Sequence, residues 1–427
     1  MEKFMTTRIL KGDICYSTDK QTLKTVSDGY LVCENGLVKG VFEQIPEQYR
    51  NLPVEDYSGK LIIPGLTDLH VHAPQYSFRG MKMDLELLDW LNTNTFPEES
   101  KYQDLEYAKK AYEIFVNDLR RGGTTRASIF ATLHVPATKL LMELVDDAGI
   151  EAYVGKVNMD RNSPDYLCEA NALAASMETA QWLVETQDAY EHVKPIITPR
   201  FIPTCSDELM SMLARVQKEF QVPVQSHLSE NSGEITWVKE LVPESRFYGD
   251  AYDGIGLFGG EVPTIMAHCV HSTLEEMKLM KERGVYIAHC PQSNENLTSG
   301  VAPVRLYLDE DMRIGLGTDV AGGATLSIFR AMTDAIQVSK LRYRLLSEQL
   351  KPITMEEAFF MGTKGGGSFF GKVGSFEEGY ECDALVLDES RIPHPQQLGL
   401  KDRLERFLYL SGDDGVLHKF IKGHKIF

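Results

Sequence analysis

Hydrophobic and polar positions divide the chain into two β-type ends and a longer middle. From Thr7 to about Leu61, short apolar runs alternate with turn residues, and no long amphipathic helix pattern interrupts them. The pair Asn35-Gly36 between two apolar runs is typical of a β-hairpin. Short β-type runs return from Gly374 onward. Because neither end alone would make a stable sheet, we expect the two ends to build one small β-sandwich together.

The middle of the chain alternates short apolar runs with segments of helical spacing. Seven runs are predicted as strands: Thr124–Phe130, Glu151–Val157, Lys194–Phe201, Val222–Leu228, Val262–Cys269, Gly284–Cys290 and Met312–Asp319. Helical spacing is clearest at 105–122, 137–149, 206–220 and 272–284. With the run that ends at His70, the pattern gives eight β/α units.

Eight such units favour a closed barrel over an open sheet. No G-x-x-x-x-G-K-[ST] motif supports the open, doubly wound alternative. The predicted fold is therefore of the α/β class, a (β/α)₈ TIM barrel at 65–365 with a composite β-sandwich built from 1–64 and 366–427.

Composition narrows the classes of partner. Hydrophobic residues make up 43% of the 427 residues and charged residues 25%, which is ordinary for a globular protein with a large core. The formal net charge of -18 would repel a phosphate backbone, so nucleic acid is not an expected partner, although a neutral base is not excluded.

Cysteine usage and hydropathy bear on location. The seven cysteines are odd in number and form no C-x-x-C pair, which favours a reducing compartment over a disulfide framework. The first residues form no apolar signal segment, and no run reaches the roughly 18 apolar residues of a membrane span. We expect a cytoplasmic protein without a membrane partner.

Candidate chemistry begins at LIIPGLTDLHVHAPQY, Leu61 to Tyr76, where an apolar run meets His70 and His72. Side chains two apart on a strand point the same way, so both imidazoles can reach one metal. A catalytic zinc usually has three or more protein ligands and one open position. Two histidines are therefore half of a site.

The ends of the other predicted strands supply the missing ligand types. His227, His268, His289 and Asp319 each lie at or near the last residue of a run, and in a barrel these ends meet at one face. Any one of them alone is more often structural, but the set together predicts a site for a divalent metal that activates water. His289 is intermediate, because it could line the site or only support it. The remaining histidines lie outside the pattern and are expected to be structural: His134, His192, His271, His394, His418 and His424.

Glu230 follows His227 by three residues in SHLSEN. A carboxylate there could simply stabilise the start of a helix. It could also be a proton shuttle whose pKa is raised by a dry pocket. The neighbouring ligand favours the second interpretation.

The order H-x-H, two later strand-end histidines and a strand-end aspartate, with β-type segments at both ends, resembles the amidohydrolase superfamily in its one-metal deaminase branch. Longer matches resemble the guanine deaminases: PGLTDLHVHAPQYSFRG, LLDWLNTNTFPEES, VGKVNMDRNSP, TPRF, SHLSEN, HCPQSN and GTDVAGG. HAPQY, TFPEES and TPRF are the sharper motifs, and AHCVHS is the loosest match. Lys156 shows no obvious use as a carboxylated ligand.

The resemblance implies a set of roles. The metal, zinc or iron and one per chain, would be held by His70, His72, His227 and Asp319. His268 would be a further ligand or a hydrogen-bond partner of the water that the metal holds. Gln75, Arg200 and Phe201 would contact the purine, for which an aromatic face and fixed donors are suited.

Guanine hydrolysis to xanthine and ammonia is the implied reaction. Asp319, with or without His268, would take a proton from water, and Glu230 would act as acid and base in turn. The resemblance also implies a homodimer. The alternatives are another amidohydrolase, either an aminopurine or pyrimidine deaminase or a chlorohydrolase, and a catalytically silent scaffold protein. The H-x-E and P-C-x-x-C pattern of the other zinc deaminases is absent.

Overall fold

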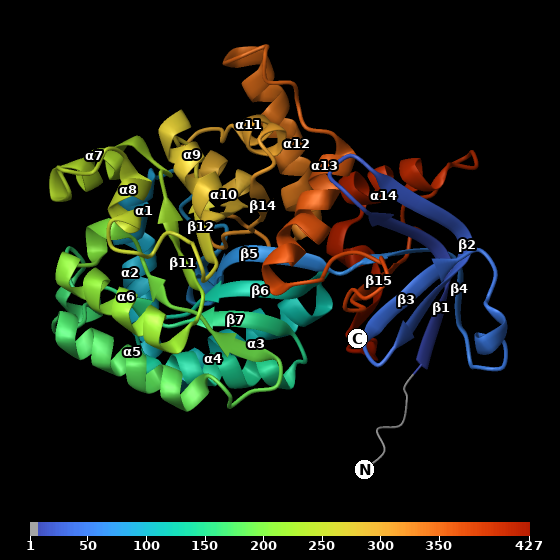
Figure 1. The fold of residues 1–427 in the computed structure, drawn as a ribbon, viewed down its shortest axis with the longest axis horizontal. Helices are drawn as coiled ribbons and strands as arrows, with labels where there is room; N and C mark the ends of the chain where they lie inside the picture. The colour runs from blue at the N-terminus through green and yellow to red at the C-terminus, as the bar shows by residue number, and fades with distance from the viewer. Residues whose placement is uncertain (1–6) are drawn as a thin grey trace.

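The computed structural model describes residues 7–427, and its centre consists of parallel strands wrapped by helices (Figure 1). One parallel sheet has the order β5-β6-β7-β9 and another the order β11-β12-β13-β14. The strands are β5 Leu66–His72, β6 Thr124–Phe130, β7 Glu151–Gly155, β9 Val193–Pro195, β11 Val224–Leu228, β12 Thr264–His268, β13 Tyr286–His289 and β14 Arg313–Leu316. A short parallel pair, β8 Val157–Asn158 and β10 Thr198–Pro199, continues β7 and β9. The predicted α/β class is confirmed.

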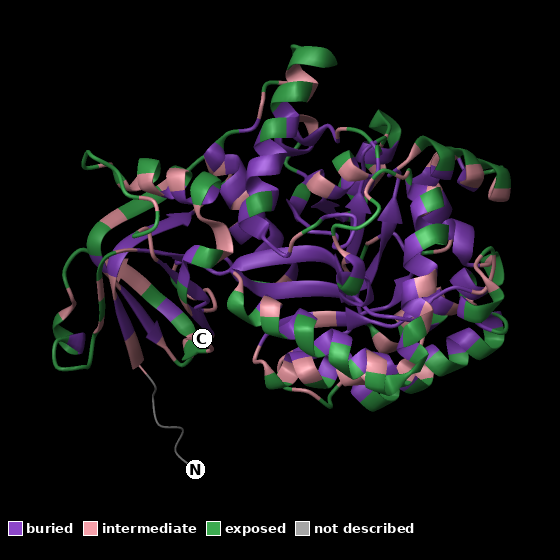
Figure 2. Ribbon diagram, turned by 180° about the vertical axis from the view of Figure 1, so that it is seen from behind, coloured by how far each residue is buried: buried purple, intermediate pink, exposed green. Residues whose placement is uncertain are grey.

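Helices follow the strands in sequence and cover them from outside. Those of the middle stretch are α3 Leu105–Arg121, α4 Val135–Asp147, α5 Ala172–Thr186, α6 Asp207–Phe220, α7 Ser232–Leu241, α8 Tyr248–Asp253, α9 Leu274–Arg283, α10 Pro291–Asn296, α11 Val304–Asp309, α12 Ile328–Leu345 and α13 Met355–Phe360. Figure 2 shows buried strands inside a layer of helices whose outer faces are exposed. The two-sided burial explains why these strands appear in the sequence as continuous apolar runs.

Several strand predictions are wrong in their extent: β14 ends at Leu316 rather than at Asp319, and β7 ends at Gly155 rather than at Val157. The run Lys194–Phe201 was expected to be a single strand, but β9 ends at Pro195 and β10 covers only Thr198–Pro199. Proline has no N–H to donate to a sheet ladder, so Pro195 and Pro199 interrupt it. Arg200 and Phe201 therefore lie in the connection after the strand.

Both ends of the chain contribute to one mixed sheet beside the parallel strands, as expected. Its order is β17-β16-β15-β4-β1-β2-β3. The strands are β1 Thr7–Ser17, β2 Leu23–Glu34, β3 Leu37–Phe42, β4 Glu55–Pro64, β15 Ala384–Leu387, β16 Val416–Ile421 and β17 His424–Lys425. Asn35 and Gly36 have φ of 50° and 81° in the tight turn between β2 and β3. The finer expectation of a two-layered sandwich stays a prediction, as do the domain boundaries, and residues 1–6 of the first segment lie outside the described residues.

The chain passes from this sheet to the parallel strands at a single glycine. β4 ends at Pro64 and β5 begins at Leu66. A side chain on Gly65 would come within 2.2 Å of the Thr125 hydroxyl oxygen. Glycine allows this close approach of two strands.

Two helical regions were not predicted from the sequence. After β5, the short helices α1 Leu87–Trp90 and α2 Phe96–Glu99 flank a π-helical turn, Leu91–Thr95. Near the end, α14 Leu400–Leu410 packs against the mixed sheet and α12. No helix within residues 7–427 is both long and apolar enough to cross a lipid bilayer.

Candidate active site

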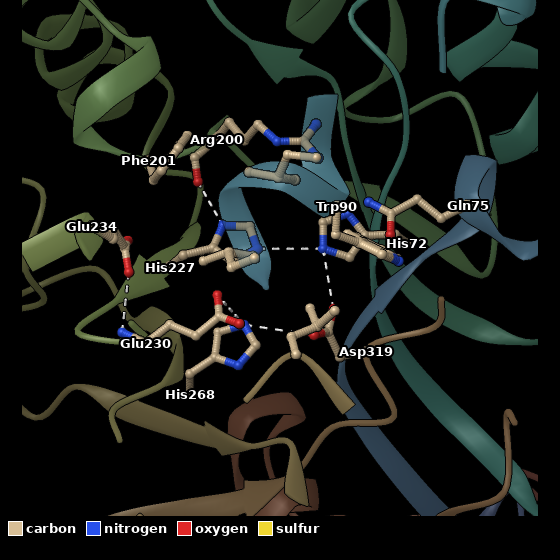
Figure 3. Close-up of a pocket in the computed structure, with 13 residues that line it drawn as sticks. His72, Gln75, Trp90, Arg200, Phe201, His227, Glu230, Glu234, His268 and Asp319 are labelled. Atoms are coloured by element: carbon tan, nitrogen blue, oxygen red, sulfur yellow. Dashed lines mark hydrogen bonds and ion pairs between the residues drawn. The ribbon is translucent and has the colours of Figure 1, made fainter. Parts of the chain in front are cut away.

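Histidines and an aspartate from four strand ends meet in one buried cluster (Figure 3). The Nε2 atom of His72 lies 3.2 Å from that of His70 and 3.3 Å from that of His227. Asp319 Oδ1 lies 3.1 Å from His70 Nε2 and 3.4 Å from His72 Nε2. The structure thus brings together residues that are up to 249 positions apart in the sequence, from 70 to 319.

His268 completes the cluster on its other side. Its Nε2 lies 3.6 Å from Asp319 Oδ2 and 3.4 Å from Glu230 Oε2. Together with His70 and His227 it forms a group whose candidate ligand atoms all lie within 4.8 Å of one another. His268 therefore lies between the ligand cluster and the carboxylic acid that was expected to shuttle protons.

Hydrogen bonds at the far ring nitrogens fix how two of the imidazoles face the cluster. His227 Nδ1 donates to the Arg200 carbonyl oxygen at 2.6 Å. His268 Nδ1 lies 2.9 Å from Asn294 Oδ1, which can only accept. Each bond keeps the proton on Nδ1, so Nε2 offers a lone pair to the cluster.

Burial and neighbouring charges set the ionisation of the cluster. Burial lowers the pKa of His72 and of His227 well below the ordinary value, and the nearby imidazoles lower it further. Burial would raise the pKa of Asp319, but His70 and His268 hold it well below its usual range. Neutral imidazoles and an ionised carboxylate are the forms that bind a metal.

Hydrogen bonds also fix the main chain around the cluster. Asp68 accepts hydrogen bonds from the His70 N–H at 3.1 Å and from the Thr318 N–H at 3.0 Å. The N–H of Asp319 donates to the His70 carbonyl oxygen at 2.8 Å. The backbone is left-handed at His268, with φ of 74°, and at Asp319, with φ of 47°. Such conformations in non-glycine residues cluster at functional sites.

A cavity opens beside the cluster, lined by apolar side chains and a few polar groups. Glu230, 3% exposed, lines it and accepts a hydrogen bond from Ser299 Oγ at 3.2 Å. Burial, followed by the charge of Asp319, raises the pKa of Glu230 above its ordinary value. A carboxyl group that retains its proton near neutral pH is suited to act as a general acid.

Gln75, Arg200 and Phe201 line the same cavity, as do Trp90 and Leu87. In Figure 3, Arg200 and Gln75 lie on the opposite side of His227 and His72 from Glu230. One side of the cavity is therefore formed by the histidine and aspartate cluster, and the other side carries the amide and guanidinium donors.

Sequence reasoning missed four residues of one segment that contribute to the cavity. Leu87, Trp90 and Leu91 line it, and Glu99 accepts a hydrogen bond from Arg200 Nη1 at 2.7 Å. All four lie in LLDWLNTNTFPEES. That motif was the available signal, but no residue within it was assigned a role.

Two other predictions can be placed in the structure. His289 is buried at the end of β13, does not line the cavity, and has no hydrogen-bond partner at either ring nitrogen among the described residues. Lys156 is buried in ion pairs with Glu169 and, at 3.3 Å, with Glu178. These pairs explain its charge without any role at the cluster.

Known proteins similar to this chain include several deaminases. The guanine deaminase of Dictyostelium discoideum is 40% identical over 388 residues, which are 87% of this chain and 84% of that protein. That of Escherichia coli (strain K12) is 35% identical over 421 residues, 95% and 92% of the two chains. The crystal structure of guanine deaminase from C. acetobutylicum, with guanine bound in its active site, has a TM-score of 0.96 and 46% identity, and the match covers 99% of this chain and 100% of that one. The model of the amidohydrolase family matches residues 61–426. The chain therefore belongs to the amidohydrolase family.

Proposed function

We propose that this protein is a guanine deaminase, which converts guanine and water to xanthine and ammonia. The observation that carries the proposal is the single cavity that joins the histidine and aspartate cluster, the buried acid Glu230 and the Arg200–Gln75 edge. The similarity to guanine deaminases over most of the chain supports the same activity.

The donor set fits a divalent cation. The Nε2 atoms of His70, His72 and His227 lie only 3.2 and 3.3 Å apart around one point, an arrangement that several imidazole ligands of one cation would have. We propose one zinc per chain, with iron as the alternative, held by His70, His72, His227 and Asp319, with His268 as a further ligand or a partner of the reacting water. When bound, such a cation is a Lewis acid that lowers the pKa of water from about 15.7 towards 7.

The residues of the chain divide the proton transfers between them. Asp319 and His268 take the proton of the attacking water as its oxygen bonds to the purine carbon that bears the amino group. Glu230, which burial keeps protonated, donates a proton to the adjacent ring nitrogen. Glu230, now ionised, then takes the proton of the new hydroxyl group and passes it to the amino group, which leaves as ammonia when the carbon–nitrogen bond breaks, and the proton held by Asp319 and His268 returns to Glu230. Water and guanine supply every atom of the products.

The other side of the cavity orients the base. Phe201, 4% exposed, offers an aromatic face, and the ring of Trp90 lines the same cavity. Arg200 and Gln75 offer N–H donors to the acceptor atoms of the purine edge. Closed apolar walls around a few fixed polar groups are typical of sites for small ligands.

We also propose the finer architecture that the sequence predicted. The parallel strands at 65–365 form a closed (β/α)₈ barrel, and the two ends form a β-sandwich. Parallel bridging of Ile197 to Val224 supports one junction between the two parallel sheets, and the hydrogen bond from Asp319 N–H to His70 O supports the other. A homodimer is proposed as the assembly, and light scattering of the purified protein tests it.

Ammonia release from a panel of aminopurines, aminopyrimidines and a chlorotriazine tests the activity. The expected result is turnover of guanine to xanthine by protein that contains about one metal per chain. Turnover of another substrate without guanine would assign a different deaminase or a chlorohydrolase. Folded protein that binds no metal and turns over nothing would assign a scaffold.

A further inference from the structure

Glu99 connects the two donor residues of the cavity. Its Oε2 accepts from Arg200 Nη1 at 2.7 Å, and its Oε1 accepts from Arg200 Nη2 at 3.2 Å and from Gln75 Nε2 at 3.1 Å. Glu99 is 1% exposed and Arg200 is 2% exposed. A buried, bidentate arginine–carboxylate pair has a fixed geometry and neutralises both charges.

The same contacts fix which atom of Gln75 is free for a ligand. Gln75 Oε1 accepts from the Ala321 N–H at 3.2 Å, while Nε2 donates to Glu99. Reversing the amide would place a donor against the Ala321 N–H and an acceptor against the Glu99 carboxylate, and both contacts would be lost. Gln75 therefore has one further N–H to offer and no unused acceptor in this direction.

We infer that Glu99 is a positioning residue which fixes Arg200 and Gln75 as an edge made only of donors, and so selects a purine that carries a carbonyl oxygen there rather than an amino group. The inference rests on the proposed function. An acceptor on the base meets unused N–H groups of both residues. An amino group would place donor against donor inside a buried cavity and leave N–H groups unpaired.

The neighbouring Glu98 offers a matched control within the same short helix, α2. It is also buried, but its carboxylate pairs with Lys101 at 2.6 Å and accepts a hydrogen bond from the Tyr107 hydroxyl. Within residues 7–427 it forms no hydrogen bond or ion pair with Arg200 or Gln75, and it does not line the cavity. Any general effect of losing a buried carboxylate from α2 should appear in both variants.

The test compares guanine with 2,6-diaminopurine, which differs from it by an amino group in place of the carbonyl oxygen. Values of kcat and KM are measured by ammonia release for wild type, E99Q and E98Q. In E99Q, one carboxylate oxygen becomes an NH₂ that opposes the donors of Arg200 and Gln75. We expect the ratio of kcat/KM for guanine to that for 2,6-diaminopurine to fall at least about tenfold, mainly through a higher KM for guanine, and to stay within about twofold of wild type in E98Q.

Two results would overturn the inference. One is an unchanged ratio in folded E99Q, and the other is an equal loss for both substrates, which would make Glu99 merely structural. If E99Q fails to fold, E99D replaces it, because retracting the carboxylate breaks the bidentate pair while keeping the charge. E99D must then lower the ratio at least about threefold, and a wild-type ratio overturns the inference. Absence of guanine turnover by the wild type would instead contradict the proposed function.

Discussion

Two buried polar clusters in this protein differ in how their charges are satisfied. In the candidate site, the Nε2 atoms of His70, His72 and His227 face one another beside the single carboxylate of Asp319. At the junction with the mixed sheet, Arg126 is surrounded by acceptors.

The junction pairs are close and complete. Arg126 lies 2.7 Å from Asp383, 2.6 Å from Glu381 and 3.2 Å from Glu151, and Lys422 lies 2.6 Å from Glu151. A cluster in which every charged group already faces an opposite charge is typical of a structural role, whereas a cluster of several imidazoles around one carboxylate is typical of a metal site. The contrast separates a structural site from a functional one without reference to any relative.

The comparison is tested most strongly by removing a ligand. His70→Ala should lose the bound metal and lower kcat/KM by roughly 10⁴-fold, because the Lewis acid contributes several kcal/mol to the transition state. Metal analysis and ammonia release measure both effects. His289→Ala is the matched control, since that strand-end histidine does not line the cavity, and it should retain its metal. Full activity in His70→Ala would contradict the assignment of the histidine cluster as a metal site.

Removing the proton shuttle should have the next largest effect. Glu230→Gln keeps the shape of the side chain but cannot exchange protons, so kcat should fall by about 10²–10⁴-fold while the metal content stays at the wild-type value. Steady-state kinetics and metal analysis on the same sample measure this. A kcat within tenfold of wild type would mean that another group carries the protons.

A substitution in the Arg126 cluster should change the stability of the protein but not its activity. Arg126→Met leaves Asp383 buried without its ion-pair partner and should lower the free energy of unfolding by about 3–5 kcal/mol. Urea unfolding measures the change, and kcat and metal content of the folded fraction should not change. Lys139→Met removes an exposed pair with Glu185 and should change stability by less than about 1 kcal/mol. Equal effects of the two substitutions would refute the structural role of the junction.

The smallest effect concerns a buried lysine at the same junction. Lys419 donates to the carbonyl oxygens of Leu119 at 2.9 Å and Thr124 at 2.8 Å. Burial lowers its pKa to about 7, although Asp413 opposes the shift. Because the folded pKa lies below the ordinary value of 10.5, the unfolded chain binds more protons between these two values, and stability should rise with pH in that window.

Urea unfolding at pH 7.5 and 8.5 measures the expected rise, on the order of 1 kcal/mol, from this group. Lys419→Met, which cannot titrate, should lack this contribution. The same slope in both proteins would show that the lysine does not account for it.

The ligand side of the site could be predicted because its residues follow a rule of the fold. His227 and His268 lie at the ends of parallel strands, and Asp319 follows the end of β14 by three residues. The apolar runs of these strands are visible in the sequence, and such ends meet at one face. Exact strand limits could not be predicted, because Pro195 and Pro199 break a run that hydropathy alone shows as continuous.

The positions of the side chains on the other side of the cavity, which is proposed to bind the base, could not be predicted. Their spacing along the sequence matches neither a helix nor a strand. Trp90 and Glu99 lie in short helices on either side of a π-helical turn, and a wider turn shifts the spacing from that of an α-helix. The pairing of Glu99 with Arg200 spans 101 positions and depends on tertiary packing. Only the resemblance of TFPEES and TPRF to known motifs drew attention to these segments.

Arg200 joins the two sides of the site. Its guanidinium faces the cavity edge, while its carbonyl oxygen accepts the Nδ1–H of His227 at 2.6 Å. A shift of Arg200 on binding of a base would therefore also move His227, a proposed metal ligand. In thermodynamic terms the two binding events are linked, and any factor by which the cation tightens the base must equal the factor by which the base tightens the cation.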